Sequence, residues 1–369
     1  MIKRILVFLF CVFGVAVWAS SVYAADTPED FDSLYTGVFS SLDDETRGLL
    51  EQIGVSDTDL YTLLSLSPGS LFSVFKGLFG TALADKAGAM GACIMIILLL
   101  RLVSSFLTSA PVKDAVQQLG GLMLAFVLIT YSAGIAESCV QAILLTKNFM
   151  LALIPALGTV MAFSGNPVSA AGVNAMVFAF GEGVSVVFAD LIVPITAAGA
   201  ALGCASALSP VGGIDKFAAM LHKAAIWIVA FTAGIFVAVL NVRGILAGAA
   251  DGVAARGLKF VISGIPVVGS AIGEALGSLR AGLGVIKNGV SILGVLAVVC
   301  INLPPLCALL IWKLMLFAVS FTAEMFEIKK IPGFLSVFTN VFNLLLAVTV
   351  FHMCVFVISL AMVVMAKGG

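Results

Sequence analysis

The stretch DGVAARGLKFVISGIPVVG, residues 251–269, lies at the centre of the one long polar interruption in an otherwise apolar chain. The interruption runs from Asn241 to Asn288, and glycines separate its charged side chains: Arg243, Asp251, Arg256, Lys259, Glu274, Arg280 and Lys287. The sequence before and after it is apolar over runs long enough to cross a bilayer. We therefore predict that 241–288 is an interfacial or re-entrant element of a membrane domain.

The composition supports a membrane protein as the fold class. Mean hydropathy is +1.19 and only 11% of residues are charged, whereas about a quarter are charged in soluble domains. The prediction is an all-α, polytopic helical membrane protein with broken or re-entrant helices, in contact with the lipid bilayer. Acidic residues crowd the region before the membrane domain, which makes a nucleic-acid partner unexpected.

The first 24 residues have the pattern of a signal peptide. Lys3 and Arg4 precede an apolar core, and Val22-Tyr23-Ala24 is a small-x-small cleavage site. A signal anchor that is not cleaved has the same character, and both alternatives place the following region outside the cytoplasm. The predicted domains are a signal peptide at 1–24, an exported acidic helical region at 25–86 and a polytopic membrane domain at 87–369.

Helical patterns run through the exported region. Thr27-Pro28 and Ser56 with Asp59 are helix start signals, and Gly54 is a stop signal. Ser67-Pro68 opens an amphipathic lead-in helix that continues toward the first span. This helix either lies along the outer membrane surface or packs against the short helices before it.

The candidate spans are 87–107, 119–136, 168–208 read as two spans, 224–246, 290–321 and 334–366. The run 149–163 is short and contains Pro155, which predicts a broken or re-entrant helix, and Pro304-Pro305 predict a break or kink. Counting 149–163 as a span places Lys216, Lys223, Lys329 and Lys330 inside the cell. Treating it as re-entrant places Arg243, Arg256, Lys259, Arg280 and Lys287 inside instead, and the positive-inside rule does not separate the two.

An internal repeat is one interpretation of the broken segments. FMLALIPALGT from Phe149 aligns with FVISGIPVVGS from Phe260, and at the same offset Pro155 meets Pro266, Gly158 meets Gly269 and Pro194 meets Pro305. Inverted repeats with discontinuous helices are common in transporters. Two independent helix breaks in glycine-rich sequence are the other interpretation.

Glu182 and Asp190 are the ionisable groups inside the apolar run 168–208. On a continuous helix they would share one face and line a polar path or bind a cation, and at a break they would lie at a water interface. We favour the interface. His222 and His352 are read as structural. The sequence holds no nucleotide-binding loop, nucleophile motif or metal-ligand cluster, so we expect neither an enzyme nor a cofactor.

With these residues in view, the chain resembles the stage III sporulation protein AE family. The likeness is most specific in ADGVAARGLKFVISGIPVVG and IKNGVSILGV, and it extends to NFMLALIPAL and LIVPI. The positions that carry it are Pro155, Pro194, Asp251, Gly252, Arg256, Lys259, Phe260, Pro266, Gly269, Lys287 and Asn288.

The resemblance implies a subunit of the channel complex that links mother cell and forespore after engulfment. It further implies a multi-pass protein of the mother-cell-derived membrane around the forespore, working beside the other membrane proteins of that complex, with no assigned catalytic residues. Small-residue stretches such as ITAAGAALGCASA favour close helix contacts within or between subunits, hence an oligomer. The alternative function is a self-contained ion-coupled secondary transporter built on inverted repeats.

Overall fold

A computed structural model describes residues 37–55, 68–163, 167–208, 216–239, 269–328 and 330–365. Within these residues the chain is helical and has no strand, which confirms the all-α prediction. The named elements are α3 (Asp44–Ile53), α5 (Pro68–Phe106), α6 (Ala110–Phe163), α7 (Pro167–Val186), η1 (Val187–Ile192), α8 (Val193–Leu208), α10 (Gly269–Met325) and α11 (Lys330–Met365). The predicted signal peptide lies outside the described residues.

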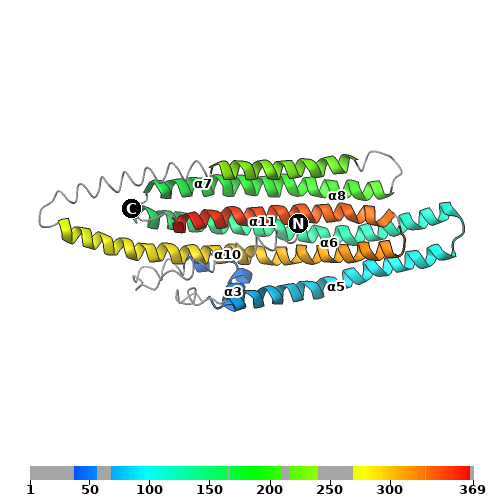
Figure 1. The fold of residues 1–369 in the computed structure, drawn as a ribbon, viewed down its shortest axis with the longest axis horizontal. Coiled ribbons are helices and arrows are strands. Elements are labelled where there is room, and N and C mark those ends of the chain that lie inside the picture. Colours follow the sequence, from blue (N-terminus) through cyan, green and yellow to red (C-terminus); the bar gives the residue numbers. More distant parts are fainter. Residues whose placement is uncertain are drawn as a thin grey trace.

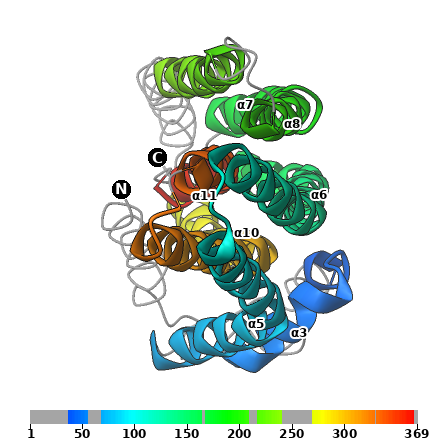
Figure 2. The same ribbon diagram turned by 90° about the vertical axis from the view of Figure 1, so that its right-hand side faces the viewer.

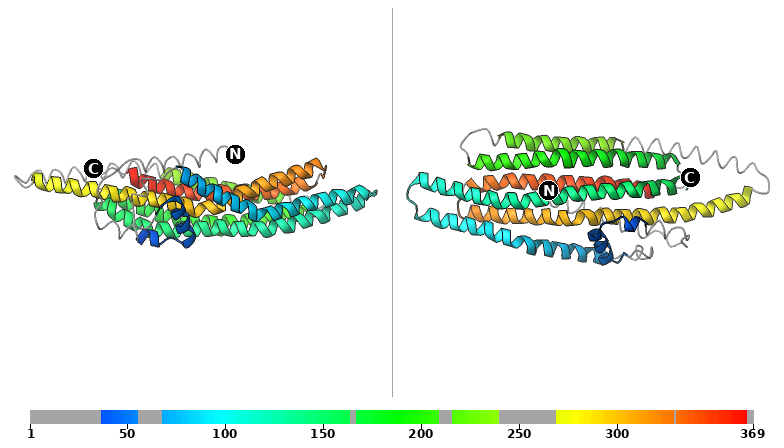
Figure 3. Two further views of the ribbon diagram at one scale, coloured as in Figure 1. Left: turned by 90° about the horizontal axis from the view of Figure 1, so that it is seen from below. Right: turned by 180° about the vertical axis from the view of Figure 1, so that it is seen from behind.

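The long helices run side by side along one axis and form an elongated bundle (Figures 1 and 3). Seen end-on, α10, α11 and α6 occupy the middle, with α5 on one side and α7 and α8 on the other (Figure 2). In the described part of the chain, six helices are long and apolar enough to cross a membrane, including Lys216–Val239, the unlabelled green helix of Figure 1. The most apolar windows of α10 and α11 are 78% and 67% buried, against 11–39% in the others, so this pair forms the core.

Helix α3 is short because both of its ends are capped. The Asp43 side chain accepts a hydrogen bond from the Thr46 N–H at the start, and Gly54 adopts the left-handed conformation (φ 98°) at the end. The stop predicted at Gly54 is therefore confirmed. Leu49, Leu50 and Ile53 are buried, and they hold this polar helix against α5 and α10.

The lead-in helix and the first span are one helix, α5. The sequence predicts that the lead-in helix either lies along the membrane surface or packs against the short helices before it. Neither position holds for its whole length. Val74 is buried and Phe72 is 66% exposed. Because the helix continues without a break into Ala87–Phe106, the lead-in extends the span along its axis.

The prediction of a broken helix at 149–163 is wrong. This run is the last part of α6, which continues through Pro155 without interruption and ends only at Phe163. Proline removes one backbone hydrogen bond and costs roughly 3 kcal/mol in a helix interior. Close packing offsets that cost, because Leu153, Ile154 and Leu157 are each 1% exposed in the main core.

The prediction of two spans in 168–208 is also wrong, since α7, η1 and α8 follow one another as a single rod. Pro194 explains the π-helical turn η1. Its ring cannot donate to the carbonyl of Asp190 and would collide with it. The wider turn, in which the Val193 N–H bonds to the Phe188 carbonyl, accommodates the proline without a break.

Pro304 and Pro305 likewise lie inside the continuous helix α10 and do not break it. The same helix includes 269–288, so this part of the predicted interfacial or re-entrant element is the first part of a long helix, and its position at the membrane stays a prediction. Residues 270–303 contain no proline, and nothing else in them forces a break. Residues 241–268 of the predicted element lie outside the described residues.

The two repeat copies differ in local structure over the described residues. The described part of the first copy is divided among α6, α7, η1 and α8, whereas the described part of the second lies within α10. The expected pattern of a short broken helix, a connector and a span is therefore absent from the described part of both copies. The repeat stays a prediction from sequence.

Replacing Gly120 with alanine is expected to destabilise the α5–α6 pair. A Cβ at Gly120 would stand 2.1 Å from Leu100 Cδ1 and 2.6 Å from its Cγ, so the buried Leu100 must move. We expect a loss of about 1–3 kcal/mol. The adjacent Gly121 has open space around it, so Gly121→Ala is expected to stabilise the helix by up to about 1 kcal/mol. Thermal unfolding of the two purified variants compares them, and equal midpoints would contradict the packing.

Candidate functional site

A buried polar contact joins α10 to α6 in the middle of the bundle. The amide of Asn302 on α10 donates to Thr146 Oγ1 on α6 at 2.9 Å and to the Val298 carbonyl at 2.8 Å. Thr146 in turn donates to the Ala142 carbonyl. Both side chains are fully buried, so in a low-dielectric interior this bond counts for more than it would in water.

An ion pair lies next to this contact, because Lys147 follows Thr146 on α6. Lys147 Nζ lies 3.2 Å from Glu182 Oε2 on α7 and 3.5 Å from Oε1. The lysine side chain is 18% exposed and the glutamate 57% exposed. The pair therefore lies at the edge of the bundle, where α6 and α7 meet.

One turn along α7, Ser185 links α7 to α11. Its oxygen lies 3.4 Å from His352 Nε2, and its hydroxyl donates to the Gly181 carbonyl. His352 Nδ1 has no hydrogen-bond partner in the described residues. His352 is fully buried and contacts Phe356 edge to face.

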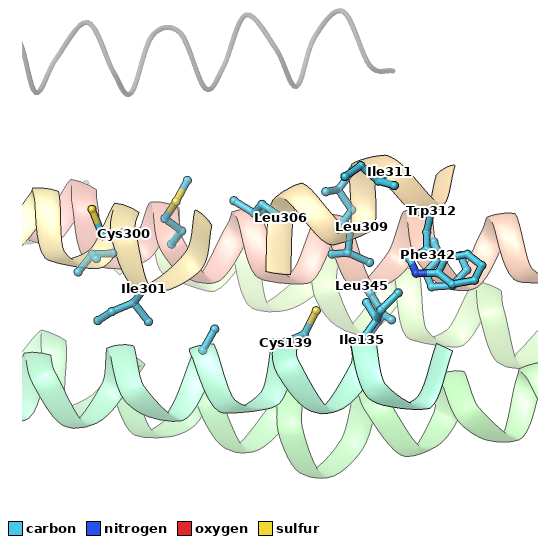
Figure 4. Close-up of a cluster of buried hydrophobic side chains, with 14 of the residues drawn as sticks. Ile135, Cys139, Cys300, Ile301, Leu306, Leu309, Ile311, Trp312, Phe342 and Leu345 are labelled. Carbon is cyan, nitrogen blue, oxygen red and sulfur yellow. The ribbon is translucent and has the colours of Figure 1, made fainter. Parts of the chain in front are cut away.

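These contacts form one polar layer, which we define as Thr146, Lys147, Glu182, Ser185, Asn302 and His352. It ties together α6, α7, α10 and α11 across an apolar interior, part of which is seen in Figure 4. Asn302 Oδ1 and His352 Nδ1 of this layer are buried and without partners in the described structure. Among the described residues no group of three or more metal-ligating side chains occurs.

A cleft of about 270 Å³ opens beside the layer, under α3. Its walls come from α3, α5, α6 and α10, and Pro304 and Pro305 form part of them together with Cys300 and Ile301. The two prolines have no N–H to offer the carbonyls of Cys300 and Ile301, four residues earlier. The remaining polar lining is Asp43, Glu45, Thr46, Asp85, Lys86, Ser138 and Gln141.

The structure separates the residues singled out from sequence. Glu182 belongs to the polar layer, and Asp190 is exposed on η1, so neither lies at a break between two spans as expected. Pro155 and Pro194 are exposed positions inside continuous helices, and Gly269 begins α10. The other predicted site residues, Asp251, Gly252, Arg256, Lys259 and Pro266, lie outside the described residues.

Sequence reasoning missed Lys147, Thr146 and Ser185, and it read His352 as structural. The partners are 35, 156 and 167 residues apart in the chain. No local spacing pairs them. The only available signal was the presence of ionisable and amide side chains within apolar runs.

Comparison with known proteins places the chain in a family. Residues 62–367 match the family model described as stage III sporulation protein AE. A relative described as stage III sporulation protein AE, from Bacillus subtilis (strain 168), is 27% identical over 243 residues, which are 64% of this chain and 60% of the relative. No solved structure matches. The family match covers most of a chain whose described residues are all-α and include six helices able to cross a membrane, and the protein therefore belongs to the stage III sporulation protein AE family.

Proposed function

We propose that this protein is a non-enzymatic membrane subunit of the channel complex that links mother cell and forespore, and that it supports forespore development after engulfment. The observation that carries the proposal is the family match over residues 62–367. Its partners would be the other membrane proteins of that complex and further copies of itself. It would lie in the mother-cell-derived membrane, with α3 on the extracytoplasmic, intermembrane side.

The bundle offers surfaces that suit such a subunit. The buried pair α10–α11 provides a rigid centre, and the polar layer fixes the register of the helices around it. Small and polar side chains are exposed along the last part of α6: Asn148, Ala152, Pro155, Thr159 and Ala162. A face without large apolar side chains suits contact with other proteins of such a complex better than contact with lipid tails.

The role is tested in a spore-forming host whose own gene is replaced. Exchange of both Arg256 and Lys259 for alanine is expected to arrest sporulation after engulfment while the protein stays in the membrane, because these cations lie in the most family-specific stretch. The matched control exchanges Lys216 and Lys223, two exposed lysines of Lys216–Val239, and is expected to sporulate normally. Normal spore yield from the first variant would contradict the proposal.

A self-contained ion-coupled transporter is the second candidate, and the polar layer is the observation that favours it. Ionisable groups between spans commonly mark ion pathways. The protein alone in liposomes would then take up substrate or ions, and Glu182→Gln would abolish the uptake. Absence of uptake by the unaltered chain counts against this function and leaves the first candidate standing.

A further inference from the structure

Side-chain contacts fix the relative heights of the helices. Leu100 of α5 lies over Gly120 of α6, Tyr131 of α6 lies beside Trp312 of α10 with ring centroids 5.4 Å apart, and Thr146 meets Asn302. On the other side, Lys147 meets Glu182 of α7. Any residue in these helices can therefore be assigned a height along α6.

Charged side chains gather at one of these heights. Glu137 and Lys147 lie on α6, and Glu182 of α7 lies opposite Lys147. Asp190 follows Glu182 by about two turns. Because the rod of α7, η1 and α8 runs antiparallel to α6, Asp190 lies near the height of Glu137. The cleft brings Asp85 and Lys86 of α5 to the height of Ser138 and Gln141. We call this set the charged belt: Asp85, Lys86, Glu137, Lys147, Glu182 and Asp190. Polar α3 packs at the same height, with the Asp44 side chain fully exposed.

From the belt to the α5–α6 turn, α6 has no charged residue between Asp114 and Glu137. At 1.5 Å per residue this separation is about 35 Å, and the hydrocarbon core of a bilayer is about 30 Å thick. Large apolar side chains are exposed on four of the helices in this zone: Met95, Leu98, Leu99, Leu102, Val103 and Phe106 of α5; Leu119, Leu122, Met123, Phe126 and Ile129 of α6; Phe217, Met220, Trp227 and Phe231; Leu314, Phe317, Phe321 and Met325 of α10. The described side chains of α8 and of 334–350 of α11 at these heights are smaller or at least partly buried.

Three cations within this zone, Arg101, Lys223 and Lys313, can reach its edges. Lys223 lies seven residues after Lys216, about 10.5 Å along the axis, and its side chain points back toward that end of the helix. Arg101 lies five residues before the end of α5, about 7.5 Å along the axis, which a long side chain spans by snorkelling. Lys313 lies beside Trp312, and side chains in a helix point toward its N-terminus. The N-terminus of α10 is on the side of the belt, so the ammonium of Lys313 is directed there.

Beyond the belt, on the side away from the α5–α6 turn, few large apolar side chains are exposed. The exposed side chains of α6 between 148 and 162 are Asn148, Ala152, Pro155, Thr159 and Ala162, none of them large and apolar. In the described stretches at this height, 72–83 of α5, 148–162 of α6, 170–181 of α7, 289–301 of α10 and 353–361 of α11, the large apolar side chains that are exposed are Phe72, Leu83, Phe178 and Ile358. Lipid-facing helices expose many more, as the zone on the other side of the belt does.

We propose that the bilayer surrounds only the half of the bundle between the α5–α6 turn and the charged belt, and that the other half stands in the aqueous space on the side of α3. The belt then lies among the lipid headgroups. Lys216–Val239 crosses this slab once, because Phe236 packs edge to face against Phe180 near the belt. Lys113, Lys216 and Glu327 lie at the opposite face.

Two threonines of α6 provide a matched test. Thr130 donates to the Phe126 carbonyl and Thr159 to the Pro155 carbonyl, and both are exposed. Thr130 lies inside the slab, and Thr159 lies about 33 Å beyond the height of Glu137 by helix rise. The native cysteines in the described residues are buried, so an introduced cysteine dominates the labelling once Cys11 is replaced by serine.

The full chain is purified, reconstituted in phosphatidylcholine–phosphatidylglycerol vesicles and treated with a charged maleimide on both sides. Since only a hydrated thiolate reacts, T159C is expected to label at least tenfold faster than T130C, and detergent should not change T159C. Equal protection of both cysteines would show lipid around both halves and overturn the proposal. Equal or faster labelling of T130C would overturn it as well. Neither readout depends on sporulation, so the proposed function is tested separately.

Discussion

Trp312→Ala is expected to lower the free energy of unfolding by about 3–5 kcal/mol, as large-to-small changes of buried tryptophan do. Trp312 is 1% exposed and lies where α6, α10 and α11 meet. Its ring stacks on Phe342 with centroids 5.9 Å apart and contacts Tyr131 at 5.4 Å, as Figure 4 shows for the Phe342 side. Alanine would leave a cavity among rigid helices that cannot close around it.

The control is Trp227→Ala, because Trp227 is 76% exposed on Lys216–Val239. It removes the same atoms from a position that lipid or detergent fills, so a change within about 0.5 kcal/mol is expected. Trp312→Phe should retain much of the stability, since the Nε1 of Trp312 has no hydrogen-bond partner in the described structure. Thermal unfolding of the purified variants in one detergent compares them. Equal midpoints for Trp312→Ala and Trp227→Ala would contradict a core at this position.

The sequence predicted where the apolar helices lie better than where they end. The predicted spans at 290–321 and 334–366 correspond to Gly289–Met325 and Phe334–Ala361. The predicted break at Pro155 and the predicted division of 168–208 were wrong for one reason, and Pro304-Pro305 likewise do not break α10. In an isolated helix a proline exposes a carbonyl, but in a packed bundle the neighbours hold the helix together and local adjustments such as η1 accommodate the ring.

The polar layer shows a second limit of sequence reasoning. Glu182 stood out because a carboxylate in an apolar run is costly, yet its partner Lys147 belongs to another run. The partners of His352 and Asn302 depend on the register of α10 and α11 against α6 and α7. That register depends on side-chain fit along whole helices, which hydropathy does not encode.

Asn302→Asp is expected to cost more than about 3 kcal/mol, because it would leave a buried charge without compensation. The exchange keeps the shape of the side chain. It removes the amide donor that now serves Thr146 Oγ1 and the Val298 carbonyl and places a carboxylate against two oxygens. Only protonation, or withdrawal of the Thr146 hydroxyl from the Ala142 carbonyl, would relieve the repulsion.

Two further variants identify the cause of this loss. Asn148→Asp makes the same chemical change at an exposed position of α6 and is expected to alter stability by less than about 0.5 kcal/mol. Asn302→Leu combined with Thr146→Val removes both polar partners at once, which is much less costly than orphaning one of them. The unfolding midpoints should therefore fall in the order Asn148→Asp, the double variant and Asn302→Asp. A double variant less stable than Asn302→Asp would mean that the layer acts through packing, because only a charge effect makes the isosteric exchange the worst of the three.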